Sequence, residues 1–180
     1  LRSDGRNGIR NTILVAYTVE CAHHVCTRIV QGCADQDAQV IGFSGCFPSG
    51  YGEDMMTALC THPNVGAVLL VSLGCESFNR IQLETVVRDS GRPVKTIVIQ
   101  KSGGTRSAIA KGQAFVTKAV AELDATPQVA MQLSDLVIGT VCGGSEGTSG
   151  ISGNPATGRA FDQLIEAGAT CIFEETGELI

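Results

Sequence analysis

The sequence predicts an α/β protein with a three-layer, doubly wound and mainly parallel sheet of about six strands, of the Rossmann-like type. Short apolar runs rich in β-branched residues alternate along the chain with segments of helical periodicity. The connections between them are short, which favours βαβ units. The run at 13–16 is apolar at every position, as expected of a strand that helices cover on both faces.

The expected elements alternate in chain order. Strands are predicted at residues 12–19, 38–43, 65–73, 94–100, 136–141 and 170–173. Helices are predicted at residues 22–32, 53–61, 78–90, 106–123 and 156–167. Gly32 is expected to end the first helix and His62-Pro63 the second, because a residue before proline disfavours helical backbone. Residues 1–11 form a polar arm with two turn signals, Asp4-Gly5 and Asn7-Gly8.

The length and composition fit a single α/β domain over residues 1–180. A chain of 180 residues with 43% apolar and 17% charged residues can bury a sizeable core. Its 22 glycines indicate many tight turns or sites lined by backbone. The sequence begins with Leu1 rather than Met and ends with Glu178-Leu179-Ile180. We therefore expect an excised piece of a longer enzyme, which could supply only part of an active site.

Charge and composition argue against two classes of partner. The formal net charge is −5, and the chain has no Trp and two Tyr, so nucleic acid is not expected. No apolar run approaches the roughly 20 residues that span a bilayer, and no secretory signal is visible, so we expect a cytoplasmic protein without a membrane partner. The eight cysteines are interpreted as reduced thiols rather than as a disulfide framework.

Four of the cysteines stand where predicted strands end. These are Cys21, Cys46, Cys75 and Cys142. Because the carboxyl ends of parallel strands share one edge of a sheet, their thiolates could converge on iron, zinc or an iron-sulfur cluster. The alternative is that small residues are needed where strands turn sharply into loops. The other cysteines lie within predicted helices or the last strand, at Cys26, Cys33, Cys60 and Cys171.

Carboxylates accompany these cysteines. Glu20 precedes Cys21, Glu76 follows Cys75, and Glu146 lies in the loop after Cys142. A partly desolvated carboxylate can act as a general base, and the alternative for each of the three is a solvated side chain without a catalytic role. We predict Glu76, Glu20, Cys21 and Cys75 as catalytic candidates, while a Cys21–His nucleophile pair lacks an evident third residue to orient it.

Two glycine-rich loops, 101–105 and 142–154, stand before predicted helices and are typical of anion sites. Neither matches the P-loop or the dinucleotide fingerprint, which disfavours a nucleoside triphosphate or a nicotinamide cofactor. The predicted substrate-binding residues in these loops are Gly103, Gly104, Thr105, Gly143, Gly144, Ser145, Ser149 and Asn154. In the polar arm, Arg6 and Arg10 could grip a carboxylate bidentately, and the alternative is a solvated basic arm.

Six motifs run in order along the whole chain: Asp4 to Asn11, Thr18 to Cys21, His62 to Val65, Gly74-Cys75-Glu76, Gly103-Gly104-Thr105, and Cys142 through Ser149-Gly150 to Pro155. This pattern resembles the altronate and galactarate dehydratase family, which includes the large subunits of sulfolactate sulfo-lyases. The chain would be a central domain, because family members have a small N-terminal module and further C-terminal sequence. The resemblance implies a lyase that removes water or sulfite from a hydroxylated acid to give a keto product, with Fe²⁺ as the usual metal, and it adds Asp4 and Asn11 to the substrate-binding candidates.

Two positions depart from the pattern of the sugar-acid members. Those members tend to carry His two residues before the Gly-Cys of the second strand exit and Gly after that Cys. Phe43 and Phe47 stand there in this chain. The departures favour the sulfo-lyase-like branch or another acid as substrate.

The main hypothesis is therefore metal-assisted β-elimination from a hydroxylated acid such as altronate, galactarate or sulfolactate. A glutamate would take the α-proton, and Arg6 or Arg10 together with a glycine loop would clamp the anionic ends. The expected partners are this small anionic substrate and the remaining domains of the same polypeptide or subunit, with a homo-oligomer left open. One alternative is a non-catalytic anion-binding or assembly module, and another is a thiol-transfer protein with an exposed cysteine of low pKa.

Overall fold

The computed structural model describes residues 1–33, 37–141, 143–144 and 146–174, and these divide into two compact units, Leu1–Gln128 and Val129–Ile180. The sequence predicted a single domain over residues 1–180. The predicted α/β class with parallel strands is confirmed in both units. The described strands form two sheets, of four and two strands, instead of one sheet of about six.

The first unit is a four-stranded parallel sheet in the order β2-β1-β3-β4. Its strands are β1 (Thr12–Tyr17), β2 (Ala38–Gly42), β3 (Val65–Ser72) and β4 (Val94–Val98). The helices between and after them are α1 (His23–Gln31), α2 (Gly50–Cys60), α3 (Arg80–Asp89) and α4 (Thr105–Asp124). Two short 3-10 turns, η1 (Glu20–Ala22) and η2 (Ile99–Lys101), follow β1 and β4.

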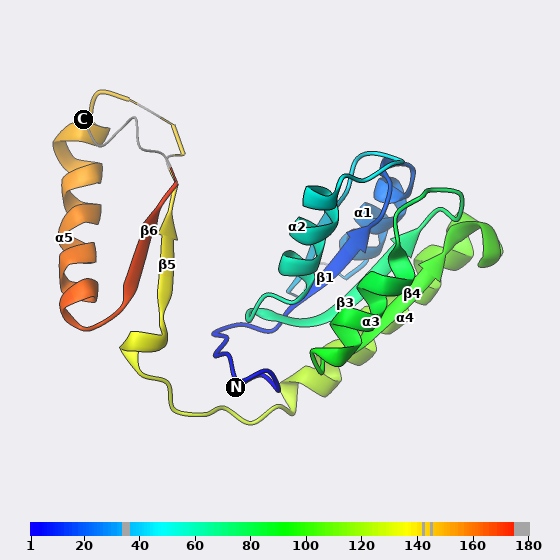
Figure 1. Ribbon diagram of the computed structural model, residues 1–180, viewed down its shortest axis with the longest axis horizontal. Coiled ribbons are helices and arrows are strands. Elements are labelled where there is room, and N and C mark those ends of the chain that lie inside the picture. Colours follow the sequence, from blue (N-terminus) through cyan, green and yellow to red (C-terminus); the bar gives the residue numbers. More distant parts are fainter. Residues whose placement is uncertain (34–36, 142, 145, 175–180) are drawn as a thin grey trace. The chain divides into compact units, whose positions relative to one another are not determined.

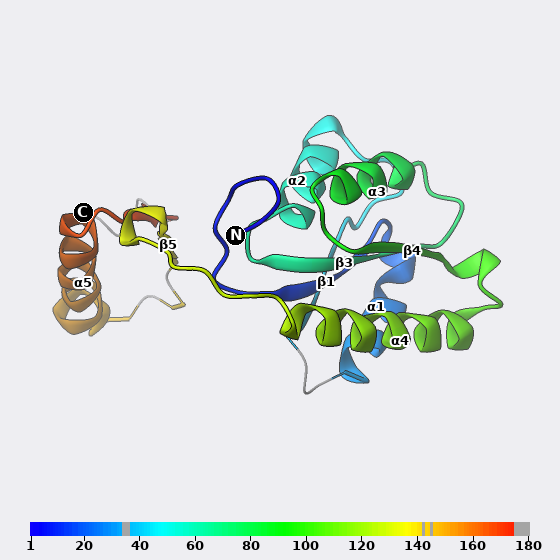
Figure 2. The same cartoon turned by 90° about the horizontal axis from the view of Figure 1, so that it is seen from below.

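Helices cover both faces of this sheet. Figure 2 shows α2 and α3 on one side of the strands and α1 and α4 on the other. Alternate residues of β3 supply the two cores: Leu69 packs toward α1 and α4, and Leu70 packs toward α2 and α3. All eight residues of β3 are buried, as the sequence predicted for a strand covered on both faces.

The element boundaries follow the local chemistry closely. The helix predicted from residue 53 begins three residues earlier, at Gly50, because the Ser49 side chain caps it by accepting a hydrogen bond from the Gly52 N–H at 3.3 Å. Asn79 caps α3 in the same way, accepting from the Gln82 N–H at 3.1 Å.

The second unit is a single parallel βαβ arrangement. It contains the 3-10 turn η3 (Leu133–Asp135), β5 (Val137–Thr140), the π-helical turn η4 (Ser149–Gly153), α5 (Asn154–Glu166) and β6 (Thr170–Phe173). Strand β5 pairs with β6, and Phe161 of α5 packs against Phe173 with ring centroids 5.2 Å apart. The alternation of strands and helices predicts βαβ units but does not indicate which strands share a sheet. The sequence was therefore interpreted as a single sheet.

No helix within the described part of the chain is long and apolar enough to cross a membrane.

Candidate active site

The candidate site lies where β1 and β3 are neighbours in the first unit. From β1 the chain moves outward to β2, then returns past β1 to β3 and β4, so the order of strands reverses between β1 and β3. Ligands of doubly wound sheets bind beyond the carboxyl ends of the strands at such a switch point. The segments that leave β1 and β3 carry the predicted catalytic residues Glu20, Cys21, Cys75 and Glu76.

Glu76 joins these two strand exits. Its carboxylate accepts a hydrogen bond from Thr18 Oγ1 at 2.6 Å and another from the Gly74 backbone N–H at 2.8 Å. Thr18 and Glu76 are both buried. Gly74 has a φ of 122°, which residues with a Cβ rarely adopt, so a glycine is what this strand exit requires.

Glu76 is ionised at neutral pH. Burial raises its pKa, but hydrogen bonds from Ser72, Thr18 and the backbone N–H groups of Gly74 and Glu76 outweigh burial and bring the pKa to about 2. Of these donors, Ser72 has the poorest geometry, because its buried Oγ meets no hydrogen-bond partner of regular distance and angle among the described residues. A carboxylate with so low a pKa is a weak proton acceptor, so Glu76 is better suited to fixing the strand exits than to acting as a general base.

Glu20 and Cys21 lie in the turn η1 and are exposed. The Glu20 carboxylate lies 3.3 Å from Nδ1 of His23, which is the first residue of α1. The His23 ring also packs against Tyr17, with ring centroids 5.1 Å apart. Unlike Glu76, Glu20 therefore stands at the surface beside a histidine, where a ligand can reach it.

The exits of β2 and β3 are also tied together. Ser77, after β3, donates from its backbone N–H at 3.0 Å and from Oγ at 2.8 Å to the carbonyl oxygen of Cys46, after β2. Phe43 is partly buried against Phe78, with ring centroids 5.9 Å apart, whereas Phe47 is 83% exposed. This wall of the site is therefore aromatic.

The structure describes three of the four cysteines that the sequence predicts as metal ligands. Cys21, Cys46 and Cys75 follow β1, β2 and β3 at one edge of the sheet, and all three are exposed and free. No group of three or more His, Cys, Asp or Glu side chains among the described residues is arranged to hold a metal ion. Cys142, the fourth predicted ligand, lies outside the described residues. The described donors by themselves do not fit a metal centre.

The glycine loop before α4 lies at the same edge. Gly103 and Gly104 have φ values of 85° and 91°, and both are exposed. Gly104 occupies the N-cap position of α4, and no side-chain hydrogen bond caps this helix. Thr105 begins α4 with its first backbone N–H groups, and such a helix start favours an anionic group.

The polar arm lies at the opposite edge of the sheet. Asn64, just before β3, accepts from the Thr12 and Ile9 N–H groups, each at 2.9 Å. The eight residues of β3 span roughly 26 Å, and the carboxyl-end residues lie beyond their far end. The structure therefore does not bring Arg6 and Arg10 together with the glycine loop of α4 around one small molecule.

The remaining arm residues have local roles. Asp4 accepts from Nε and Nη2 of Arg6 at 3.2 and 2.7 Å, and these bonds lower the Asp4 pKa to about 2. Asn11 lines a separate shallow hollow of about 200 Å³ with Leu123 and Asp124 at the end of α4.

The loop after β5 belongs to the second unit. Gly143, Gly144 and Asn154 are exposed there, and Ser149 begins η4. Ser145, like Cys142, lies outside the described residues. The prediction that this loop binds the substrate stays a prediction.

Sequence reasoning overlooked two buried polar groups. Thr18 was noted only as part of a motif, although a hydroxyl residue directly after an apolar strand is the signal that could have identified it. Arg92 was interpreted only as part of a turn, yet it is 4% exposed and donates to the carbonyl oxygens of Val65 and His62, both at 3.1 Å. An arginine between Gly91 and Pro93 gave no sequence signal of burial.

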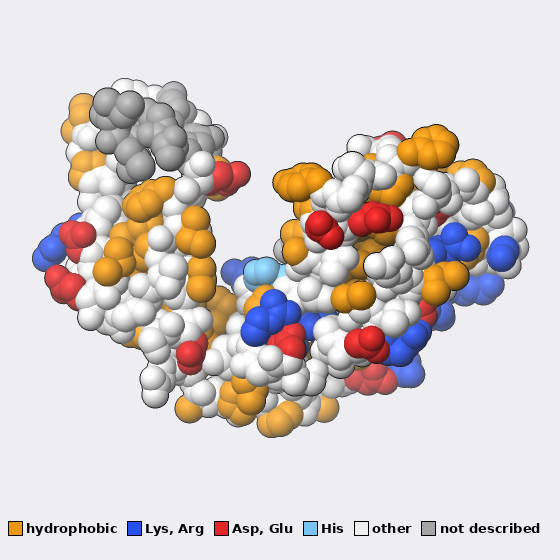
Figure 3. Space-filling view, in the orientation of Figure 1, with side chains coloured by type: hydrophobic (Ala, Val, Ile, Leu, Met, Phe, Trp, Pro, Cys, Tyr) orange, Lys and Arg blue, Asp and Glu red, His pale blue; other side chains and the backbone are white. Residues whose placement is uncertain are grey.

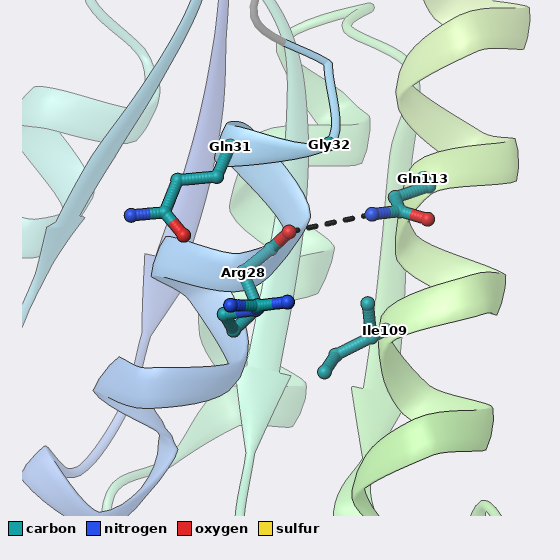
Figure 4. Close-up of a pocket in the computed structure, with 5 residues that line it drawn as sticks. All are labelled: Arg28, Gln31, Gly32, Ile109 and Gln113. Atoms are coloured by element: carbon teal, nitrogen blue, oxygen red, sulfur yellow. Dashed lines mark hydrogen bonds between the residues drawn. The ribbon is translucent and has the colours of Figure 1, made fainter.

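A hollow of about 220 Å³ between α1 and α4 contains none of the predicted site residues (Figure 4). It is lined by Arg28, Gln31, Gly32, Ile109 and Gln113. Gln113 Nε2 donates to the Arg28 carbonyl oxygen at 3.3 Å, which links the two helices.

Comparisons with known proteins cover both units. Residues 1–124 match the family model for D-galactarate dehydratase/altronate hydrolase, second domain. Residues 133–180 match the model for D-galactarate/altronate dehydratase, C-terminal. No solved structure gives a significant match.

Similar curated proteins are lyases. Altronate dehydratase of Bacillus subtilis is 28% identical over 99% of this chain and 38% of its own length. The subunit beta of (2R)-sulfolactate sulfo-lyase of Chromohalobacter salexigens is 32% identical over 99% of this chain and 46% of its own length. Galactarate dehydratase (L-threo-forming) of Escherichia coli is 33% identical over 66% of this chain and 24% of its own length.

The chain thus spans less than half the length of each of these relatives. The resemblance that the six motifs carry is confirmed by the family models. On the match of residues 1–124, the chain belongs to the D-galactarate dehydratase/altronate hydrolase family.

Proposed function

We propose that the chain is part of a lyase that performs β-elimination on a hydroxylated acid, with the switch point between β1 and β3 at the reacting centre. The observation that carries this proposal is the similarity of almost the whole chain to altronate dehydratases and to a sulfolactate sulfo-lyase subunit. The carboxyl edge of the first sheet supports it, because the segments that leave β1 and β3 carry exposed Glu20, Cys21 and Cys75 together with a buried, ionised carboxylate.

The elimination needs a base for the carbon-bound proton next to the substrate carboxylate. As that C–H bond breaks, its electron pair forms the double bond, and hydroxide or sulfite leaves the neighbouring carbon with its bonding pair. The resulting enol then becomes the keto acid. Glu20 is our candidate for the base, because it is exposed beside His23.

The other residues have positioning roles in this proposal. Glu76, held by Thr18 and Gly74, fixes the exits of β1 and β3 relative to each other. The exposed N-terminus of α4, after Gly103 and Gly104, offers backbone N–H groups to a substrate carboxylate. Residues held in place before the reaction lower the cost of orienting the substrate.

Turnover by the full-length protein on altronate, galactarate and sulfolactate tests the proposal. Glu20→Gln keeps the shape of the side chain and removes the base, and we expect kcat to fall roughly 100-fold or more. Glu122→Gln is the matched control, since Glu122 lies on α4 in an exposed pair with Lys118 and has no part in the site. Equal kcat for both variants, or no turnover of any of the three acids, would contradict the proposal.

Fe²⁺, which the family resemblance implies, remains a prediction for the full-length protein, with another divalent metal or an iron-sulfur cluster as the alternatives. Elemental analysis of protein purified without oxygen measures it. Retention of full turnover after complete removal of metal by a chelator would exclude a metal requirement.

A second candidate function is a non-catalytic module that binds an anion for a larger enzyme. The observation that favours it is length, because the chain spans only 38% of the altronate dehydratases. Calorimetry with the 180-residue chain distinguishes the two functions: binding of an acid without turnover, when the full-length protein does turn the acid over, assigns the chemistry to other parts of that protein.

A further inference from the structure

Arginines gather at the amino-terminal edge of the first sheet, away from the proposed reacting centre. Arg2, Arg6 and Arg10 come from the polar arm, and Arg92 comes from the turn before β4. Arg2 donates from Nε to the Pro63 carbonyl oxygen at 2.6 Å and from Nη2 to the Arg10 carbonyl oxygen at 2.7 Å. Figure 3 shows basic and histidine side chains side by side over this edge.

The cluster has an excess of positive charge. Asp4 is the one carboxylate among the ion pairs described for these four arginines, at 2.7 Å from Arg6 and 3.5 Å from Arg92. Burial lowers the pKa of Arg2 and of Arg92, and the charge of Arg92 beside Arg2 and of Arg6 beside Arg92 lowers each pKa further. In a chain of net charge −5, three formal positive charges remain unbalanced here.

The arginines differ in how far their guanidinium N–H groups are already hydrogen-bonded. Arg92 is buried, and its Nη1 makes only long hydrogen bonds, at 3.4 Å to the Ser90 carbonyl oxygen and 3.5 Å to Asp4. Arg10 is exposed, and its side chain takes part in no hydrogen bond or ion pair described for residues 1–33, 37–141, 143–144 and 146–174. Arg2 holds the Arg10 backbone through its carbonyl oxygen, so the position of Arg10 is fixed although its side chain is free.

The cluster already holds one carboxylate of the chain itself, that of Asp4. Arg6 donates from Nε and Nη2 to a single oxygen of Asp4, at 3.2 and 2.7 Å. Guanidinium groups bind planar carboxylates through such adjacent donors, and a charge-assisted bond of this kind is stronger than a neutral one.

We infer that this edge carries an anion-binding site for the carboxylate of a small molecule, separate from the switch point between β1 and β3. Arg10 contacts the ligand, Arg2 fixes the Arg10 backbone, and Arg6 and Arg92 add positive charge at the same edge. The roughly 26 Å length of β3 separates this site from the carboxyl edge, so its ligand is a second anion and not the far end of the reacting substrate. The inference does not rest on the proposed function.

Arginine labelling of the unaltered full-length protein tests the site. Phenylglyoxal modifies accessible guanidinium groups, and peptide mass spectrometry reports the rate at each arginine. Succinate is the probe, because it carries two carboxylates but no hydroxyl or sulfonate to eliminate. We expect succinate to slow labelling of Arg10 relative to NaCl of equal ionic strength, and to leave Arg28, an exposed residue of α1, unchanged. Equal labelling of Arg10 in the two salts, or equal protection of Arg28, overturns the inference.

A matched pair of variants gives a second measurement. Arg10→Gln removes a side chain that supports no described contact, and we expect succinate to bind this variant roughly tenfold more weakly or worse, as loss of a charge-assisted hydrogen bond predicts. Lys118→Gln removes the same charge from the exposed face of α4 and should bind succinate as the unaltered protein does. Equal affinity of the two variants overturns the inference. Inorganic phosphate, measured in parallel, shows whether the site prefers a carboxylate, and tighter binding of phosphate than of succinate at Arg10 overturns the assignment of the ligand.

Discussion

Glu76 shows how one side chain can connect two strands that are far apart in the sequence. It lies 58 residues from Thr18, its hydrogen-bond donor, and both are buried beyond the ends of neighbouring strands. A buried ionised carboxylate is costly unless donors surround it, so the donors and the charge depend on each other.

Replacement of Thr18 by Val removes one donor and preserves the side-chain shape. We expect the free energy of unfolding to fall by roughly 1.5–3 kcal/mol, because a hydrogen bond to a charged group is lost. Thr85→Val is the control, since Thr85 is exposed and its hydroxyl donates to the Ile81 carbonyl oxygen within α3. Urea unfolding of the two variants measures the difference, and an equal cost for both would show that the Thr18–Glu76 bond contributes nothing specific.

The pH dependence of stability provides a second measurement on Glu76. Its pKa is lowered from 4.5 to about 2 in the folded protein. The folded state therefore binds this proton less readily than the unfolded state, so the stability that Glu76 contributes is present above pH 4.5 and is lost as the pH falls toward 2. Unfolding measured between these pH values should show a smaller loss for Glu76→Gln than for the unaltered protein.

The cysteines should divide sharply by reactivity. Burial raises the pKa of both Cys26 and Cys60 to about 12, so neither forms a thiolate readily. We expect iodoacetamide at neutral pH to label the exposed Cys21, Cys46 and Cys75 first, as peptide mass spectrometry would report. Rapid labelling of Cys26 or Cys60 in the folded protein would contradict this burial.

At the scale of elements, the sequence predicted the strands and helices to within a few residues, because apolar runs and caps are local features. The continuous apolar run of β3 predicts a buried strand, and the glycines before α4 predict the loop that precedes this helix. The position of the arm could not be predicted, since it depends on contacts such as that of Arg2 with Pro63, 61 residues away. For the same reason the sequence placed Arg6 and Arg10 beside the glycine loops.

The exit of β3 depends on Gly74. With a φ of 122°, an added Cβ would lie 2.8 Å from Gln100 Oε1 and 2.9 Å from Val98 Cγ1. We expect Gly74→Ala to lower the free energy of unfolding by roughly 1–3 kcal/mol, as backbone strain of this kind costs. Gly158→Ala is the control, because Gly158 lies in α5 and an added Cβ there would meet open space among the described residues outside its own helical turn. Thermal unfolding measures both variants.

At the scale of the whole molecule, the two units differ in how far they bury their apolar residues. The core residues of β1 and β3 are almost fully buried, whereas Val137 of β5 and Ile172 of β6 are 61% and 53% exposed. A two-stranded sheet has little stability on its own, and parallel sheets are ordinarily covered on both faces. The sequence did not distinguish these cases, since Leu136 and Val141 extend the apolar residues of β5 into a run that resembles a buried strand.

Hydrogen exchange should show this difference directly. In the 180-residue chain we expect the amides of β5 and β6 to exchange much faster than those of β1 and β3, because opening a two-stranded sheet exposes little buried surface. Exchange of all four strands at one rate would indicate instead that the two units unfold together.

The ring of Phe43 restricts which substitutions the β2 exit can accept. A Cβ at Gly45 or at Gly52 would lie 2.8 or 2.9 Å from the ring of Phe43, so the ring fills the space that a side chain at either glycine would need. A smaller residue at position 43 alone would leave a void, and a larger residue at either glycine alone would collide with the ring. Substitutions at these three positions are therefore coupled. A change from this aromatic wall to a polar one is easiest if position 43 first acquires a small residue and either glycine changes afterwards.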